Sequence, residues 1–152
     1  MTPDPAPILD LIEAFRRSKT MFAAVALGVF DLLEGGARDV EAVATATGTR
    51  AEALDRLLDG CVSLGLLRRE GTAYANTAVA STYLVRSSPR TIAGYSLYSN
   101  QALFPMWAHL EDALREGSPR WEQSFGPAAD LFSHFFRTDE ALADFLMGMH
   151  GF

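Results

Sequence analysis

The sequence predicts a mainly α-helical protein that contains one small β-hairpin. Over most of the chain, apolar side chains recur three or four residues apart, which is the spacing of one helix face. The exception is a pair of short runs, 66–69 and 73–75, on either side of the turn signal Glu70-Gly71-Thr72. With the helices on its two sides, this hairpin gives residues 50–84 the order helix, strand, strand, helix. That order is typical of a winged helix, and a second helical region follows it.

The first two predicted helices differ in how their apolar residues are distributed. Residues 8–18 are predicted to form an amphipathic helix, because one face carries Ile8, Leu11, Ile12 and Phe15. The next helical stretch, 20–34, is apolar on nearly every side and ends at Gly35-Gly36. A helix without a polar face is buried in a core or against another chain. We therefore expect this stretch to supply a subunit interface.

The predicted winged-helix unit has recognisable helix ends. Asp39 is placed to cap a helix over 40–47 that Gly48 ends. Thr49 and Glu52 form a capping box for a helix over 50–65. One face of that helix carries Leu54, Leu57, Leu58, Cys61 and Leu64. Asn76-Thr77 caps the helix that follows the hairpin and carries Val79, Tyr83 and Leu84.

The linker Ser87-Ser88-Pro89 separates residues 8–88 from residues 89–152, and we treat these as two regions. A long helix is predicted over 91–116 with a kink at Pro105, and Gly117-Ser118-Pro119 ends it. Trp121 and Phe125 are placed in a loop. Two further helices are predicted over 128–136 and 139–150, the second one capped by Thr138.

Composition and charge exclude several classes of protein. The net charge of −6 gives no general attraction to nucleic acid or to anionic membranes. A winged helix that binds DNA needs a basic reader helix, but residues 50–65 carry two arginines against three carboxylates. We find no signal peptide and no run of 18 apolar residues, so a cytoplasmic location is expected. The single lysine among many arginines is typical of a GC-rich bacterial genome.

The sequence contains no recognisable catalytic, cofactor or metal motif. Its only cysteine, Cys61, lies among leucines, as a small buried apolar residue does, and it can form no internal disulfide. The spacing of His109, His134 and His150 matches no zinc-binding pattern. Neither a glycine-rich nucleotide loop nor a distinctive pair of carboxylates occurs. We therefore assign no catalytic residue, no bound cofactor and no metal to this chain.

Four blocks of sequence resemble one known family. They are FAAVALGVFDLLEGG (22–36), LLDGCVSLGLLRREGTAYANTAVASTYLV (57–85), MWAHLEDALREG (106–117) and ADLFSHFFRTDEALADFLMGMHGF (129–152). Together they are similar to the N-terminal region of S-adenosylmethionine-dependent O-methyltransferases of the acetylserotonin and plant-phenolic type. Bacterial tailoring methyltransferases share this region. The resemblance implies a helical dimerisation domain with a winged-helix-like unit.

In that family a Rossmann domain follows and holds S-adenosylmethionine and the catalytic base. The chain ends before the motif that begins such a domain, so we expect the catalytic domain to be absent from these residues. The resemblance further implies a homodimer, whose predicted interface residues are Met21, Phe22, Val25 and Phe30. It also implies a wall of the pocket for an aromatic small-molecule acceptor, made of Trp107, Phe132, Phe145 and Met149. Packing in the core is the alternative role for each of these residues.

The interpretation that combines these observations is the dimerisation and substrate-lid module of a small-molecule O-methyltransferase. Two alternatives remain open. One is a free-standing homodimeric module that binds a hydrophobic small molecule or a partner enzyme. The other is a winged-helix transcriptional regulator, which the negative charge of residues 50–65 disfavours.

Overall fold

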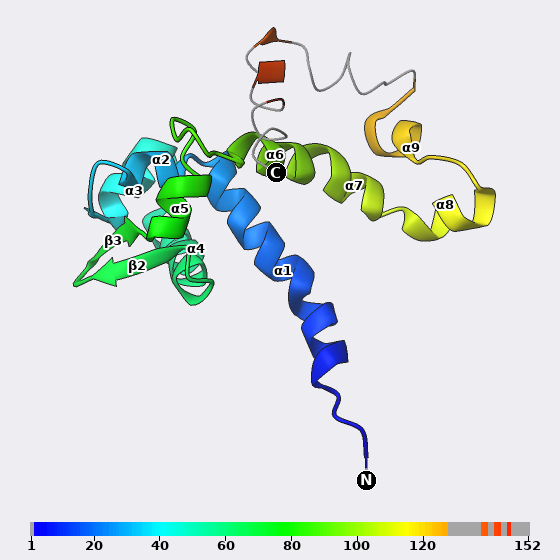
Figure 1. Cartoon of the computed structure of the whole chain (residues 1–152), viewed down its shortest axis with the longest axis horizontal. Coiled ribbons are helices and arrows are strands. Elements are labelled where there is room, and N and C mark those ends of the chain that lie inside the picture. Colours follow the sequence, from blue (N-terminus) through cyan, green and yellow to red (C-terminus); the bar gives the residue numbers. More distant parts are fainter. Residues whose placement is uncertain (1, 128–137, 140–141, 144–145, 147–152) are drawn as a thin grey trace. The chain divides into compact units, whose positions relative to one another are not determined.

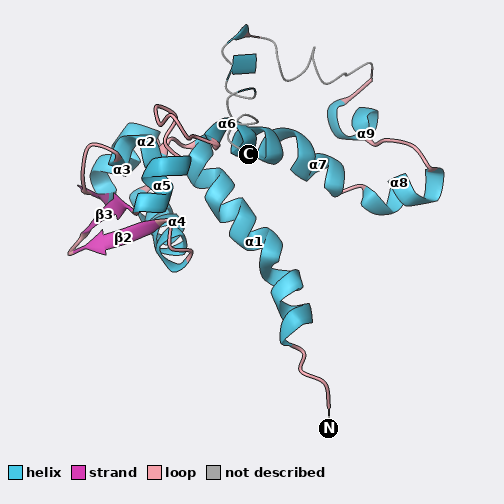
Figure 2. Cartoon of the chain, viewed as in Figure 1, coloured by secondary structure: helices cyan, strands magenta, loops and turns pink. Residues whose placement is uncertain are grey.

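The computed structural model describes residues 2–127, 138–139, 142–143 and 146. The chain divides into two compact units, Met1–Pro89 and Arg90–Phe152. Helices dominate the described residues of both units, and a small sheet of three short antiparallel strands lies in the first (Figures 1 and 2). The predicted class, mainly α with a winged-helix-like unit, is therefore confirmed.

The first unit opens with a long helix, α1 (Ala6–Ala26), and a short one, α2 (Val29–Leu33). Pro7 lies in the first turn of α1, where the missing N–H of proline breaks no hydrogen bond. The predicted division into helices over 8–18 and 20–34 is wrong, because nothing between Ile8 and Ala26 interrupts helical hydrogen bonding. The chain breaks instead at Gly28, whose φ of 71° lies in the left-handed region that glycine tolerates.

Of the caps predicted for the next two helices, one is present and the other is not. Helix α3 (Val40–Thr47) is capped as expected, since the Ala42 N–H donates to Asp39 Oδ1 over 2.8 Å and Gly48 ends the helix. Helix α4 (Ala51–Ser63) has Arg50 as its N-cap residue, without a capping side chain. The predicted capping box is wrong, because Thr49 lies one residue too early; its hydroxyl lies 2.8 Å from the hydroxyl of Thr47.

The hairpin forms as predicted from β2 (Leu67–Glu70) and β3 (Ala73–Asn76), which run antiparallel with Leu67 opposite Asn76. A third strand, β1 (Arg38–Asp39), pairs with the other edge of β3 and was not predicted. Two residues are too few to show strand periodicity, so only the tertiary pairing identifies β1. The Thr77 hydroxyl caps α5 (Ala78–Tyr83), as expected.

The core of the first unit joins α2 and α4 to the sheet. Its largest fully buried side chains include those of Phe30, Leu58, Leu67 and Tyr74. The buried Asn76 amide donates to the Phe30 carbonyl over 2.8 Å and so joins β3 to α2. Helices α1 and α4 approach closely where a Cβ on Gly60 would lie 3.1 Å from Thr20 Cγ2.

The second unit begins with α6 (Ala93–Tyr98), a π-helical turn η1 (Ser99–Leu103), α7 (Phe104–Trp107) and α8 (Leu110–Glu116). The prediction of one helix over 91–116 is wrong. Pro105 lacks an N–H and its ring crowds the carbonyl four residues earlier, so the wider π turn accommodates it. A second break at Ala108 and His109 separates α7 from α8.

The end of the second unit is described only in part. Gly117 ends α8 in the left-handed conformation, as expected. Residues Trp121–Phe125 form the short helix α9 and not the predicted loop, because Pro119 and Gly126 leave room for one helical turn between them. In the predicted helix 139–150, the described residues 139, 142, 143 and 146 are helical. The predicted helix 128–136 lies outside the described residues.

Candidate dimerisation surface

The first half of α1 exposes a row of large apolar side chains. We call Ile8, Leu11, Ile12 and Phe15 the α1 stripe; each is 54–70% exposed, and Leu9 on a neighbouring face is also exposed. Within the first unit, this half of α1 extends away from the other helices (Figure 1, blue). Contiguous exposed apolar surface on a helix is typical of an interaction site.

The opposite side of the same helix half is charged and internally paired. Arg17 donates to Asp10 over 2.7 Å, and Arg16 donates to Glu13 over 2.8 Å. The hydrogen bond and charge of Arg17 lower the pKa of the Asp10 carboxyl. These pairs join the charges of this part of α1 to one another, and the Arg16 guanidinium also lies 5.6 Å from the centre of the Phe15 ring, at the edge of the stripe.

The structure divides the four predicted interface residues into two pairs. Val25 is 3% exposed and Phe30 is fully buried within this single chain, so core packing already accounts for their apolar character. Met21 and Phe22 are only partly buried and still have surface to offer a partner. The interface assignment of all four residues stays a prediction.

A hollow lies beside the stripe, between α1 and the turn that joins α4 to β2. We call it the α1 hollow; its volume is about 290 Å³, and its lining is Arg17, Ser18, Met21, Leu64 and Leu66. Apart from the arginine and serine on α1, this lining is apolar. The sequence showed the helical spacing of the stripe, but nothing in it showed that the stripe would stay uncovered beside a hollow.

The buried side chain of Tyr74 joins β3 to α4 and β2 through hydrogen bonds. The Tyr74 hydroxyl on β3 lies 2.6 Å from Asp55 Oδ1 and 2.8 Å from Asp59 Oδ1, both on α4, and shares its one proton with them. Arg69 on β2 donates to the Tyr74 oxygen over 2.7 Å, and its guanidinium lies 4.9 Å from the centre of the ring. Burial, and then the two carboxylates, raise the pKa of Tyr74, so the phenol stays protonated.

The other arginine of the wing is also engaged within the hairpin. Arg68 donates to the carbonyl of Asn76 and to Glu70 Oε1, the latter over 2.6 Å. Both arginines that a DNA-binding wing would direct at phosphates therefore contact acceptors of their own unit. Together with the three carboxylates of α4, this pairing disfavours the regulator interpretation.

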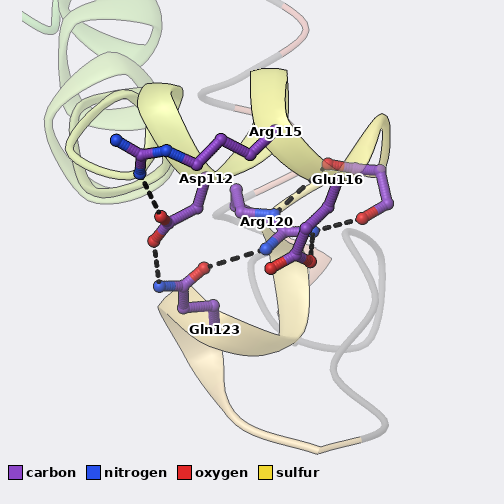
Figure 3. Close-up of polar contacts among 6 residues, drawn as sticks. Asp112, Arg115, Glu116, Arg120 and Gln123 are labelled. Carbon is purple, nitrogen blue, oxygen red and sulfur yellow. Dashed lines mark hydrogen bonds and ion pairs between the residues drawn. The ribbon is translucent and has the colours of Figure 1, made fainter.

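The α8–α9 corner of the second unit carries a polar network (Figure 3). Arg120 contacts Glu116 at 2.7 Å, Gln123 Oε1 at 3.3 Å and the Ser118 hydroxyl. Asp112 accepts from Gln123 and from Arg115, each over 3.0 Å, and these contacts lower the pKa of its carboxyl. A polar hollow of about 560 Å³ lies at this corner, between Glu116 and Gln123. Because its two arginines and two acids bind one another, the network stabilises the corner and offers no activated group.

Of the predicted pocket wall, only Trp107 lies among the described residues. It is 66% exposed on α7, so its indole has open surface. Phe132, Phe145 and Met149 lie outside the described residues, as do His134 and His150. His109 is the N-cap residue of α8.

The described residues contain no cluster of three His, Cys, Asp or Glu side chains that could hold a metal. Cys61 is fully buried, and burial raises the pKa of its thiol to about 11, which makes it a poor nucleophile. None of the helices in the described part of the chain combines the length and apolar character needed to cross a membrane.

The described fold does not fit S-adenosylmethionine. In doubly wound folds such a cofactor lies at the carboxyl ends of parallel strands, beside a glycine-rich turn. The sheet described here has only two- to four-residue antiparallel strands, and a hairpin joins two of them. No step of a methyl transfer is therefore assigned to these residues.

Comparison with known proteins decides the family. Residues 9–86 match the family model described as the O-methyltransferase dimerisation domain. The chain belongs to this family. The match covers all of the winged-helix-like unit and all but the first turn of α1, including most of the α1 stripe.

Relatives of this dimerisation domain are longer proteins. Acetylserotonin O-methyltransferase of Gallus gallus is 39% identical, and the match covers 96% of this chain and 44% of the relative. Human N-acetylserotonin methyltransferase, solved in complex with SAM, superposes with a TM-score of 0.82 at 38% identity; the match covers 99% of this chain and 46% of that one. The pyocyanin biosynthetic protein PhzM gives a TM-score of 0.78 at 27% identity, over 96% and 43% of the two chains. The chain therefore spans under half the length of these relatives.

Proposed function

We propose that these residues are the dimerisation and substrate-lid module of a small-molecule O-methyltransferase. The observation that carries this proposal is the exposed α1 stripe on a chain of the O-methyltransferase dimerisation family. An apolar surface of this kind costs free energy in water and is stabilised by a second chain. A homodimer is the assembly that the family description favours.

The chemistry belongs to a domain outside these 152 residues. The Gallus gallus relative is an acetylserotonin O-methyltransferase and the human one was solved with SAM, so we propose methyl transfer from S-adenosylmethionine to a phenolic or indolic hydroxyl. The module would contribute Trp107, and with it Phe132, Phe145 and Met149, to one wall of the acceptor pocket. A flat aromatic acceptor suits such a wall because aromatic side chains stack on it.

The first experiment measures assembly. Sedimentation equilibrium of the 152-residue chain over a concentration series is expected to show a monomer–dimer equilibrium in the micromolar range or tighter. A strict monomer at tens of micromolar would contradict the dimerisation proposal. Salt-dependent retention on DNA at near-physiological ionic strength would instead support the regulator alternative.

The second experiment concerns the catalytic domain. The reading frame that encodes these residues is expected to continue into a segment with a glycine-rich cofactor loop, and the full polypeptide is expected to bind S-adenosylmethionine. A stop codon directly after Phe152, with no such segment encoded nearby, would favour the free-standing homodimeric module.

A further inference from the structure

The corner between α8 and α9 combines a hollow with a buried arginine (Figure 3). The hollow has a volume of about 560 Å³, within the range of about 300–1,000 Å³ typical of small-molecule sites. The Arg120 side chain in its lining is only 10% exposed, whereas the Glu116 side chain, paired with it at 2.7 Å, is 61% exposed. We infer that this hollow binds a small monocarboxylate, whose carboxylate replaces that of Glu116 at Arg120.

The guanidinium of Arg120 is also held by groups other than Glu116. Its Nε donates to the Ser118 carbonyl over 3.2 Å, one terminal nitrogen donates to Gln123 Oε1 over 3.3 Å, and the other donates to the Ser118 hydroxyl. None of these bonds involves Glu116, so they hold the guanidinium in position when Glu116 leaves. A guanidinium that is already positioned and largely removed from water is well suited to bind a carboxylate.

The carboxylate of Glu116 can be exchanged at little cost. It lies in the last turn of α8 and is mostly exposed, so it regains water when it leaves Arg120. Ion pairs with an exposed partner are weak, because water competes with the pair. The incoming carboxylate takes over the same pairing, and Arg120 is therefore never left buried without a counter-ion.

The rest of the lining favours a ligand with one negative charge and a flat body. Glu122 is an exposed acid in the lining, and it would repel a phosphate ester or a dicarboxylate more than a monocarboxylate. Pro119 and Trp121 supply apolar surface, and the ring centres of Trp121 and Phe125 lie 4.9 Å apart, which positions the indole. An aromatic ring packs well on such a surface. Benzoate has both features and is the probe of choice.

The test uses the 152-residue chain with Trp107→Phe, so that Trp121 is its only tryptophan. Benzoate is expected to change the Trp121 fluorescence saturably, with a dissociation constant of about 1 mM or tighter. Inorganic phosphate and benzylamine, which has the shape of benzoate and the opposite charge, are expected to bind at least about tenfold more weakly. Equal affinities for the three probes, or no saturation below about 10 mM benzoate, would overturn the inference.

Four variants of this chain locate the site. Glu116→Gln removes the competing carboxylate and is expected to tighten benzoate binding at least about fivefold, while Glu111→Gln, at an exposed acid of α8 outside the lining, changes it by less than about twofold. Arg120→Gln is expected to weaken binding at least about tenfold, while Arg115→Gln, at an arginine that is 72% exposed, leaves it within about twofold. Circular dichroism of each variant checks the fold.

Glu116→Gln is the decisive variant, because it keeps Arg120 and the other contacts of the corner. If Arg120 served only to hold α9 against α8, this change would leave the affinity for benzoate unaltered, and that result would overturn the inference. Tighter binding supports it. Neither outcome depends on the proposed dimerisation, since every lining residue belongs to the second unit.

Discussion

The two halves of α1 have the same helical backbone and opposite surroundings. From Ala6 to Phe15 the large apolar side chains face water, whereas Ala24 and Val25 near the end of the helix are buried. The second half packs where Thr20 meets Gly60 of α4. The first half has apolar side chains of the same kind but no neighbour within its unit to cover them.

This difference separates folding from association. Side chains in the second half contribute to the free energy of unfolding of the single chain, because they are removed from water when it folds. Under the proposed dimerisation, side chains in the first half would contribute when a second chain covers them. The same substitution should therefore have different effects in the two halves.

The largest effect is expected for Val25→Asp in the buried half. It places an unpaired carboxylate in a 3%-exposed site and should lower the free energy of unfolding by about 3–5 kcal/mol. Urea denaturation at several protein concentrations, extrapolated to the monomer, measures this loss. A loss below about 1 kcal/mol would show that this half of α1 is not part of the core.

The matched change in the exposed half is Ile12→Asp with Phe15→Asp. Each side chain buried on association is worth about 1.5–3 kcal/mol, so the dimer should weaken at least about a hundredfold by sedimentation velocity. The monomer's free energy of unfolding should change by less than about 0.5 kcal/mol. Val79→Asp, at another exposed apolar site, is the control and should leave the dimer intact. A variant that unfolds instead of dissociating would contradict the division of α1.

A smaller change in the free energy of unfolding is expected when the pH is raised. It arises from Cys61, which directly follows Gly60 at the contact of α1 with α4. Burial raises its thiol pKa from 9.0 to about 11 in the folded chain, so the unfolded chain loses this proton first as the pH rises. The folded chain is therefore most stable below pH 9. Its free energy of unfolding should fall by about 2 kcal/mol as the pH rises from 9 toward 11.

The free energy of unfolding of Cys61→Ala provides the comparison for that loss. The variant should be less stable than the wild type at pH 8, because it leaves a cavity. The difference between the two chains should then shrink as the pH approaches 11. A constant difference across this range would mean that the thiol is not buried in solution.

The smallest effect tests the contact between the two helices. Alanine gains about 1 kcal/mol over glycine inside a helix, but a Cβ at Gly60 would lie 3.1 Å from Thr20 Cγ2. Gly60→Ala should therefore stabilise the chain by about 1 kcal/mol more in a Thr20→Ala background than in the wild type. Additive effects in this double-mutant cycle would show that the two helices do not touch there.

Most of the local structure could be predicted from residues close together in the sequence. Asp39 and Gly48 bound α3, and Gly71 turns the hairpin, because caps and turns depend on a few neighbouring residues. Some local features, such as the helix break at Gly28, were missed, and so were features set by distant neighbours. Strand β1 exists only through its pairing with β3.

The candidate site was predicted only in part, for the same reason. The apolar stretch 20–34 was expected to form an interface, yet Val25 and Phe30 are buried within their own chain, since α2 packs beside α4 and the sheet. The spacing of Ile8, Leu11, Ile12 and Phe15 indicated a helix face but not its exposure. Whether an apolar face is covered depends on which elements lie against it.

The sequence alone determined the helical class, the hairpin, both ends of α3 and the family, because these follow from local spacing and from blocks of similar residues. Tertiary structure decided which apolar residues are buried on folding and which stay exposed. In the folded unit, the two arginines of the wing, Arg68 and Arg69, also donate hydrogen bonds to acceptors of their own unit. Those outcomes depend on contacts between residues far apart in the chain, and local spacing does not encode them.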